Sequence, residues 1–503
     1  MDRPRGRARQ PGPNPSRHQW GRGGGRSRGA ERAKPHARTA HDVDPRKAAF
    51  ETLRRLEPGE RIEPAVFATL RHMGADGALA SRVLPQVEDA VRFALLFDHL
   101  VSHVATRPVT ELDRDVRAAL HMFLAWLIHD PRAAYAHGNA AVDLLTAKHA
   151  GRGFVNACAR KLSGFVSAES EDREEHAAAA QRGETLPLWA DRCRLGDGRM
   201  LVGKHAILPD PAKDLASHVS VACGIPRLLA DKLIEQHGPQ AAVQAGVACV
   251  ERPLTWIRPN VLYAENFHLP QWWTAQGIPV TRHEDVFALP ARVRPVSDHP
   301  GFARGGFYVQ DWAAQQVAPM LQAQPGEAIL DLCSAPGGKA GHIAELTGDK
   351  AKILACDISA AKEERIRENI ARMGYRGVAT VVADAATVRF PEKFDRVLID
   401  APCSNSGVLG RRVEARHRIT EAALKELAEL QHKILENAAA NLKPGGVIVY
   451  SVCSILMEEG VDVIHRFMGP REKLGWQVQQ EKFILPVPAF HDGGYICRLS
   501  APE

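Results

Sequence analysis

Two cysteines and one aspartate are the residues of this chain whose types and positions are most suited to chemistry. Asp400 and Cys403 follow the apolar run 397–399 in the order Asp-Ala-Pro-Cys, and Cys453 follows a second apolar run, 446–450. A thiol that loses its proton is a nucleophile, and a neighbouring carboxylate can hold or deliver a proton. Either cysteine alone would more often be a small buried hydrophobic residue. Together they predict nucleophilic catalysis.

The two cysteines depend on the strands that must carry them. The apolar runs before Cys403 and Cys453 are short and are separated by a helical segment, 424–442, which predicts two buried strands of a parallel sheet. Consecutive strands of an open parallel sheet usually lie side by side, with their carboxyl ends at one edge. The two thiols are therefore expected to face each other across a cleft.

A third predicted strand, 328–332, leads into the glycine-rich turn 333–339 and then into a helix. This order is typical of the first crossover in a nucleotide-binding α/β fold, where backbone amides at a helix N-terminus bind an anionic group. The turn is not a Walker A loop, because Lys339 is followed by Ala340, and it lacks Gly-x-Gly-x-x-Gly. A compact cofactor that carries a carboxylate is therefore favoured over a pyrophosphate.

Acidic residues stand at the carboxyl ends of four consecutive predicted strands: Asp331, Asp357, Asp384 and Asp400. Carboxylates crowded at one edge of a sheet repel one another, so such a set indicates a ligand that uses them. Asp357 follows Asp331 by 26 residues, near the position at which doubly wound folds place an acid on ribose hydroxyls. A single aspartate of this kind would carry no such meaning.

The composition limits the class of protein. The chain has 503 residues, 45% of them hydrophobic, which suits about three domains. Its nine cysteines include no Cys-x-x-Cys pair, and His-Glu-x-x-His is absent, so neither a disulfide framework nor a metal site is predicted. We expect no membrane span and no signal peptide, because no apolar run is long enough and none follows the basic N-terminus. The cytoplasm is the expected location.

The first 43 residues are predicted to be a disordered tail rich in arginine and glycine. Residues 1–40 hold eleven Lys/Arg and two acids, a charge of +9, whereas the whole chain carries +6. Such a segment buries too little apolar surface to offset the entropy cost of ordering it. Its Arg-Gly runs suit a phosphate backbone without sequence preference. A tail that only aids solubility is the alternative.

Residues 44–165 are predicted to form an all-α domain, with Asp44 as the N-cap of the first helix. Three stretches of this region resemble a NusB-type RNA-binding domain: Arg46–Ala49, Val109–Leu127 and Gly153–Asn156. The resemblance implies contact with RNA or with a ribonucleoprotein.

The middle of the chain is less patterned. The charged and turn-rich segment 166–216 is predicted to be a linker or an insertion. In 217–300, Trp272 and Trp273 mix with cationic residues as aromatics do on RNA-stacking surfaces, while Trp256 is expected in a core.

Four motifs of the C-terminal part occur together: Asp331–Lys339, Asp400–Ser404, Ser451–Ser454 and His491–Tyr495. Together they resemble the RsmB/Sun family of RNA 5-methylcytosine methyltransferases, over about residues 301–499. A NusB-like part in front is the arrangement of the small-subunit rRNA branch of that family. The resemblance implies a Rossmann-like domain that uses S-adenosylmethionine, and a cytidine of 16S rRNA as the substrate.

The resemblance also implies a role for each site residue. The turn would surround the methionine part of the cofactor, Asp357 would bind the ribose, and Asp384 would lie by the adenine. Cys453 would add to C6 of cytosine as a thiolate, Asp400, near both cofactor and base, would assist at N3, and Cys403 would help to release the product. Lys339 would lower a thiol pKa or hold a phosphate. The turn residues in question are Cys333, Ser334, Ala335, Pro336, Gly337, Gly338 and Lys339.

The chemistry explains why these residue types are needed. C5 of cytosine is a poor nucleophile until a thiolate has added to C6, and the target base must be unstacked or lie in a single-stranded loop. Two positions depart from the family pattern: Val452 stands where a threonine is usual, and 410–418 lacks the usual Pro-Asp, which leaves its RNA contacts open.

We therefore predict an α/β enzyme, a metal-free monomer that methylates C5 of a cytidine in 16S rRNA. Its predicted parts are the tail 1–43, a NusB-like domain 44–165, a linker or insertion 166–216, a small RRM-like substrate-recognition region 217–300 and a Rossmann-like methyltransferase domain 301–503. A tRNA cytosine-C5 methyltransferase is the nearest rival, which the NusB-like part disfavours. A non-catalytic RNA-binding ribosome assembly factor would need neither the cysteines nor the acids.

Overall fold

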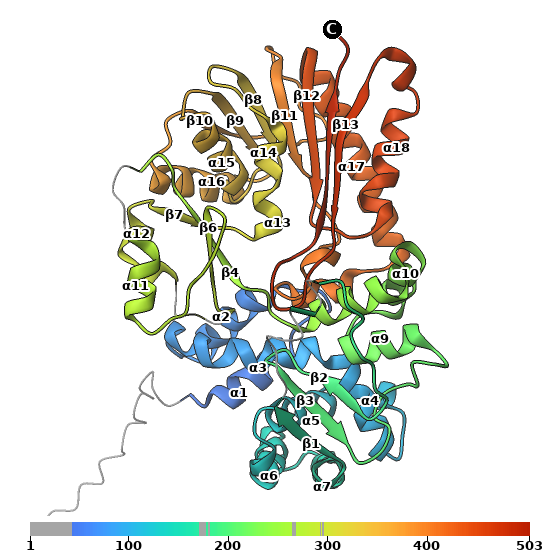
Figure 1. Ribbon diagram of the computed structural model, residues 1–503. Helices are drawn as coiled ribbons and strands as arrows, with labels where there is room; N and C mark the ends of the chain where they lie inside the picture. Colours follow the sequence, from blue (N-terminus) through green and yellow to red (C-terminus); the bar gives the residue numbers. More distant parts are fainter. Residues whose placement is uncertain (1–42, 171–177, 180–181, 264–267, 292, 294–295) are drawn as a thin grey trace, which may run out of the picture. The chain divides into compact units, whose positions relative to one another are not determined.

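The computed structural model describes residues 43–503, apart from 171–177, 180–181, 264–267, 292 and 294–295 (Figure 1). The predicted tail lies outside the described residues except for Val43. Part of the predicted linker or insertion is outside them as well.

The first part of the described chain is helical, as predicted. Asp44 caps the first helix by accepting a hydrogen bond from the Arg46 amide, and Pro45 occupies the first helical position. The central helix α5 is buried from Ala118 to Leu127, so it is apolar on nearly all sides and forms the middle of the bundle. The helices are α1 (Pro45–Leu53), α2 (Ile62–His72), α3 (Ala80–Arg92), α4 (Ala94–Val104), α5 (Arg114–Leu127), α6 (Ala134–Leu144) and α7 (Arg152–Phe165).

A small antiparallel sheet and two helices follow the bundle. The segment predicted as a linker or insertion contains β1 (Val166–Ser170), β2 (Arg192–Arg194) and β3 (Arg199–Gly203), in the order β1-β3-β2. The next helices, α9 (Leu215–Cys223) and α10 (Arg227–Val250), pack into the same apolar core as α1 to α7. Helix α10 is kinked at Gly238, which has a non-helical φ of +80°. The next residue, Pro239, has no amide hydrogen and cannot continue the helical hydrogen bonds.

A second antiparallel sheet has the strand order β5-β6-β4-β7. Its strands are β4 (Thr255–Pro259), β5 (Thr281–His283), β6 (Val286–Leu289) and β7 (Phe307–Val309), with α11 (Leu269–Ala275) and α12 (Pro300–Ala303) between them in the chain. Trp256 is buried, which confirms the core position expected for it, and Trp273 is buried as well. These two rings therefore stabilise this region and are not free to stack on RNA.

The C-terminal part contains a seven-stranded sheet in the order β10-β9-β8-β11-β12-β14-β13. Strands β8 to β12 pair in parallel, and β14 is antiparallel to both of its neighbours. This arrangement confirms the predicted Rossmann-like α/β class. The strands are β8 (Ala328–Leu332), β9 (Lys352–Asp357), β10 (Val378–Val382), β11 (Phe394–Asp400), β12 (Leu442–Val452), β13 (Gln477–Ile484) and β14 (Gly494–Ser500).

Helices cover both faces of this sheet (Figure 1). In β11, Val397 and Ile399 pack with α17 (Glu421–Asn441) and α18 (Val461–Met468), while Leu398 points to the opposite face. That face is covered by α13 (Trp312–Gln315), α14 (Val317–Leu321), α15 (Gly338–Leu346) and α16 (Ala360–Met373). Burial on both sides explains why this strand is a continuous apolar run.

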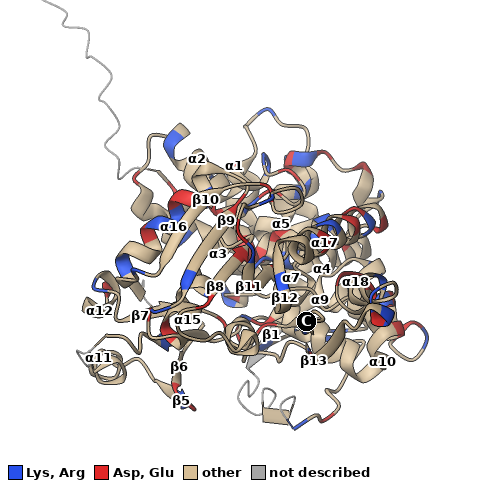
Figure 2. Cartoon of the chain, turned by 90° about the horizontal axis from the view of Figure 1, so that it is seen from above, with Lys and Arg blue, Asp and Glu red and all other residues tan. Residues whose placement is uncertain are grey.

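Charges of both signs mix on the helices that surround the sheet (Figure 2). On α16, for example, Glu364 forms an ion pair with Arg367 one turn later. Among the described residues, no helix combines the length and the apolar character that crossing a membrane requires.

Candidate active site

The two cysteines meet at one edge of the sheet, as the sequence predicts. Strands β11 and β12 are parallel neighbours, with Asp400 opposite Ser451. The loops that follow bring Cys403 Sγ to within 3.0 Å of Cys453 Sγ, and the Cys453 thiol lies 3.3 Å from Asn405 Oδ1. Both residues are half-buried. Of the two, Cys453 lines a cavity at this edge of the sheet.

A lysine and a serine orient Asp400. Lys339 Nζ donates to Asp400 Oδ2 at 2.6 Å, and Ser451 Oγ donates to the other carboxylate oxygen at 3.0 Å. Burial by itself would lower the pKa of Lys339, but the charge of Asp400 and its hydrogen bond raise this pKa above its ordinary value. Lys339 is therefore an ammonium group at neutral pH, and its charge lies close to both Asp400 and Cys453.

The two thiols have different electrostatic surroundings. The hydrogen bond with Cys453 and burial raise the pKa of Cys403 well above that of a free thiol, and the carboxylate of Glu459 adds to this effect. Cys403 is thus held in the protonated form. Cys453 lies beside the Lys339 ammonium.

The glycine-rich turn leaves no room for side chains at two positions. A Cβ on Gly338 would lie 2.8 Å from the Tyr308 ring, and one on Gly337, whose φ is +95°, would lie 3.1 Å from Ile366. Helix α15 begins at Gly338, so the last two residues of the stretch predicted as a turn form the start of the expected helix. The turn therefore brings bare backbone to the edge of the sheet.

Of the four strand-end acids, Asp331 supports the turn from below. It is fully buried, and its carboxylate accepts a hydrogen bond from Ser334 Oγ at 2.6 Å. Burial raises the pKa of Asp331 to about 7. Its side chain lies under the edge rather than in an open crevice, which differs from the expectation that all four acids point into the crevice.

Asp357 and Asp384 lie at the ends of the neighbouring strands β9 and β10. Asp357 accepts hydrogen bonds from the amides of Ala335 and Ile358, at 3.0 and 2.8 Å. Asp384 is exposed and accepts from the Ala386 amide at 2.9 Å. Ile358, which is 63% exposed, offers an apolar surface directly beside Asp357. The sheet edge thus combines acids, an apolar patch and bare backbone.

A second set of charges lies beside the cysteines and was not predicted as a site. A cavity of about 60 Å³ is lined by Cys453 and Asp400, and also by Asp311 and Asp492. Arg411 donates to both of these acids, at 3.0 and 2.7 Å. Burial and the charge of Asp311 raise the pKa of Asp492 to about 7, although Arg411 opposes this. The motif His491–Tyr495 was the only sequence signal for this cluster.

In the basic segment that departs from the family pattern, Arg416 is buried, while Arg411, Arg412, His417 and Arg418 are exposed. Arg416, on η6 (Val413–Arg418), is 1% exposed, and burial lowers its pKa to about 10. Its guanidinium donates to the carbonyl oxygens of Arg92, Gly224 and Cys249, near the C-terminal ends of α3, α9 and α10. Arg411 and Arg416 therefore tie the fold together.

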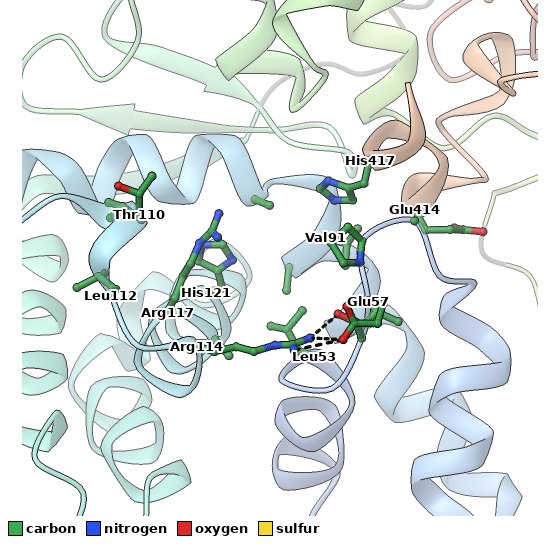
Figure 3. Close-up of a pocket in the computed structure, with 17 residues that line it drawn as sticks. Leu53, Glu57, Val91, Thr110, Leu112, Arg114, Arg117, His121, Glu414 and His417 are labelled. Carbon is green, nitrogen blue, oxygen red and sulfur yellow. Dashed lines mark hydrogen bonds and ion pairs between the residues drawn. The ribbon is translucent and has the colours of Figure 1, made fainter. Parts of the chain in front are cut away.

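A larger cavity, of about 480 Å³, lies between the helical bundle and η6 (Figure 3). Its cationic side chains are already compensated: Arg114 pairs with Glu57, and Arg117 pairs with Asp98. Burial, with the charges of Arg416 and Arg117, lowers the pKa of His417 to about 4, so this ring is neutral at neutral pH. The cavity therefore has no strong attraction for an anion.

Residues 318–486 match the model of a family described as 16S rRNA methyltransferase RsmB/F. This part of the chain is thus similar to RsmB/F methyltransferases. The chain is 36% identical over 288 residues to ribosomal RNA small subunit methyltransferase B of Klebsiella pneumoniae (strain 342), covering 53% of this chain and 64% of that protein. It is 39% identical over 231 residues to the protein of that name from Salmonella dublin, and this match covers 43% of this chain and 52% of that protein. The matches thus span less than two thirds of these relatives.

Two solved structures have folds similar to all or part of this chain. The crystal structure of PH0851 has a TM-score of 0.67 at 22% identity, and covers 91% of this chain and 99% of its own. The crystal structure of NSun6 from Pyrococcus horikoshii with SFG has a TM-score of 0.50 at 20% identity, and the match covers 55% of this chain and 98% of that chain. At such identities the similarity concerns the fold alone.

Proposed function

We propose that this protein transfers a methyl group from S-adenosylmethionine to C5 of a cytidine in RNA, through a covalent bond between Cys453 and C6. One observation carries the proposal: two thiols lie 3.0 Å apart beside the Lys339–Asp400 pair, at the sheet edge of a domain similar to RsmB/F methyltransferases. An inert core would not need this combination, because buried charges and paired thiols cost free energy.

The residues of the sheet edge fit this cofactor. Its ribose hydroxyls and amino group call for carboxylates, its adenine for an apolar surface, and its carboxylate for backbone amides at a helix N-terminus. Carboxylates are offered by Asp357 and Asp384, and an apolar surface by Ile358. Backbone amides are offered by the turn 333–339 at the start of α15. When bound, the cofactor supplies an electrophilic methyl group on a sulfonium.

Cys453 begins the proposed reaction. Its thiolate, stabilised by the Lys339 ammonium, forms a bond to C6 of the base, and the electron pair of the C5–C6 double bond moves to make C5 nucleophilic. The Asp400 carboxylate, oriented by Lys339 and Ser451, takes up the proton that the Cys453 thiol loses and passes it to N3 as negative charge develops on the ring. C5 can then accept the methyl group.

Cys403 assists the release of the product. After methylation, a water molecule takes the proton from C5, and the electron pair of that C–H bond re-forms the C5–C6 double bond. The C6–S bond breaks, and its electron pair returns to the Cys453 sulfur. The Cys403 thiol, which is held protonated, can donate a hydrogen bond to that sulfur as the charge returns. In a protein without Cys403, breakage of the C6–S bond should be slowed more than the earlier steps of the reaction.

The proposed substrate is 16S rRNA, because the curated relatives are named small subunit rRNA methyltransferases. Within this proposal the protein acts as a metal-free monomer in the cytoplasm, residues 44–165 contact RNA, and 217–300 contribute to recognition of the substrate. Methylation of tRNA is the rival within the same chemistry.

The proposal can be tested with the tritiated-methyl cofactor and 16S rRNA that lacks the modification. We expect label in 5-methylcytidine with the wild-type protein, none with Cys453→Ala, and a covalent protein–RNA adduct with Cys403→Ala. Unmodified tRNA in a parallel reaction separates the two substrates. An active Cys453→Ala protein would overturn the assigned roles.

A further inference from the structure

Behind the two cysteines lies a buried carboxylate to which the proposed reaction gives no part. Glu459 ends the short helix η7 (Met457–Glu459), which follows the Cys453 loop, and it is 0% exposed. Within the described part of the chain it forms no ion pair, so only hydrogen-bond donors compensate its charge. A buried carboxylate is costly unless such donors are fixed in place.

The donors come from both cysteine loops. Glu459 Oε1 accepts from the Ser404 amide at 2.7 Å, and Oε2 accepts from the hydroxyls of Ser404 and Ser454, both at 2.5 Å. Ser404 directly follows Cys403, and Ser454 directly follows Cys453. One carboxylate therefore joins the two loops that carry the thiols.

Neighbouring bonds extend this connection. Gln431 of α17 donates both to Glu459 Oε1, at 3.1 Å, and to the carbonyl of Pro402, at 2.9 Å. Ser406 Oγ lies 2.8 Å from Ser454 Oγ, and the Tyr450 hydroxyl donates to the Glu459 carbonyl at 2.6 Å. The two loops are thus fixed to each other and to the helix behind them.

We propose that Glu459 is a positioning residue that holds the Cys403 and Cys453 loops together, so that the two sulfurs stay in contact. The inference rests on the proposed function only in that the thiols are taken as the reacting groups. A loop displacement of about 1 Å can cost two orders of magnitude in rate, so a rigid connection behind the thiols has a direct catalytic consequence.

The charge of Glu459 acts in the same direction. The hydrogen bond with Cys453 and burial raise the pKa of Cys403, and the Glu459 carboxylate raises it further. The same residue that fixes the two loops therefore also helps to keep Cys403 in the thiol form, as the proposed release step requires.

A bifunctional thiol reagent tests the geometry without any RNA. Dibromobimane alkylates two neighbouring thiols, with loss of two bromides, and becomes fluorescent when both sites have reacted. We expect the Glu459→Ala protein to form this cross-link about tenfold more slowly than the wild type, because its loops separate. Glu459→Gln keeps the size and most of the hydrogen bonds, so it should restore at least half of the wild-type rate.

Three controls make the outcome specific. Cys403→Ala and Cys453→Ala should give no cross-link, which assigns the signal. Glu345→Gln alters another buried carboxylate of the same domain, which is bonded to Arg258 and Tyr375. It should lower the melting temperature without slowing the cross-link. A Glu459→Ala protein that cross-links at the wild-type rate, or a Glu345→Gln protein that is slowed equally, would overturn the inference.

The result is independent of the proposed function. If the wild-type protein forms the cross-link but methylates no RNA, the proposed function fails and the geometry stands. If RNA is methylated normally and Glu459→Ala leaves the cross-link unchanged, the inference about Glu459 fails alone.

Discussion

Two cavities of the molecule differ in how their charges are used. The larger, about 480 Å³, lies between the helical bundle and η6, and its arginines pair with acids of the same region. The smaller, about 60 Å³, lies at the cysteine edge of the sheet, where Lys339, Asp400 and the two thiols meet. Volume therefore does not mark the site. What distinguishes the smaller cavity is a pair of thiols in contact beside a lysine–aspartate ion pair.

The largest expected effect is at Cys453, the sulfur proposed to attack the base. Replacing Cys453 with alanine should reduce single-turnover methylation by at least about 10³-fold, because the remaining thiol, Cys403, is held protonated and is a poor nucleophile. The matched control is Cys158→Ala, which removes a buried thiol from α7 in the helical bundle. We expect the control to keep methylation within about twofold of the wild type. Equal activity of the two variants would show that the thiol at the sheet edge matters no more for methylation than a thiol buried in the helical bundle.

The next effect concerns the acid beside the thiols. Asp400→Asn should lower kcat by about 10²-fold or more, because the amide cannot deliver a proton to N3. Asp395 lies on the same strand, β11, at its far end, where it pairs with Lys443. The control Asp395→Asn should change kcat by less than about threefold. A similar loss in both variants would indicate a general defect of the strand.

A third effect is a pH dependence of stability at the cysteine edge. The pKa of Asp492 is about 7 in the folded protein, mainly through burial, against 3.8 for a free side chain. Between these values the folded state binds more protons than the unfolded state, so Asp492 lowers stability as pH rises from about 4 to about 7. Between pH 5 and pH 8, the melting temperature of the Asp492→Asn protein should therefore fall by less than that of the wild type. Identical losses would show that Asp492 is ionised well below pH 7.

The smallest effect is expected at the larger cavity. Arg114 is an exposed side chain paired with Glu57, and such pairs contribute at most about 1 kcal/mol to the free energy of unfolding. Arg114→Ala should leave RNA affinity and methylation within about twofold of the wild type, measured by filter binding and by label transfer. A tenfold loss of RNA affinity would instead make this cavity part of the RNA-binding surface.

The sequence was sufficient to predict the sheet and the pairing of its sulfurs. Apolar runs ending in Asp400 and before Cys453 predict adjacent strands, since sequential parallel strands tend to be neighbours, and the structure confirms this. The burial of Trp256 could be predicted for the same kind of reason, because a large aromatic in an apolar strand usually packs into a core.

Other features depend on contacts between distant segments, which local patterns do not encode. Asp311 looks like a simple helix N-cap, and only the fold brings it to Asp492, 181 residues later. Glu459 likewise stands in an ordinary acidic pair of residues, and its role emerges only when Ser404 lies beside it. The sequence left the RNA contacts of 410–418 open, and only the fold shows that Arg416 is buried against three helix ends.

The most direct test of the central claim is a covalent adduct between the protein and RNA. Cys403→Ala protein is incubated with cofactor and unmodified 16S rRNA, denatured and separated by gel electrophoresis. We predict a slowly migrating adduct that is absent from the double variant Cys403→Ala/Cys453→Ala and that peptide mapping places on Cys453. An adduct that persists in the double variant, or maps to another residue, would contradict the account.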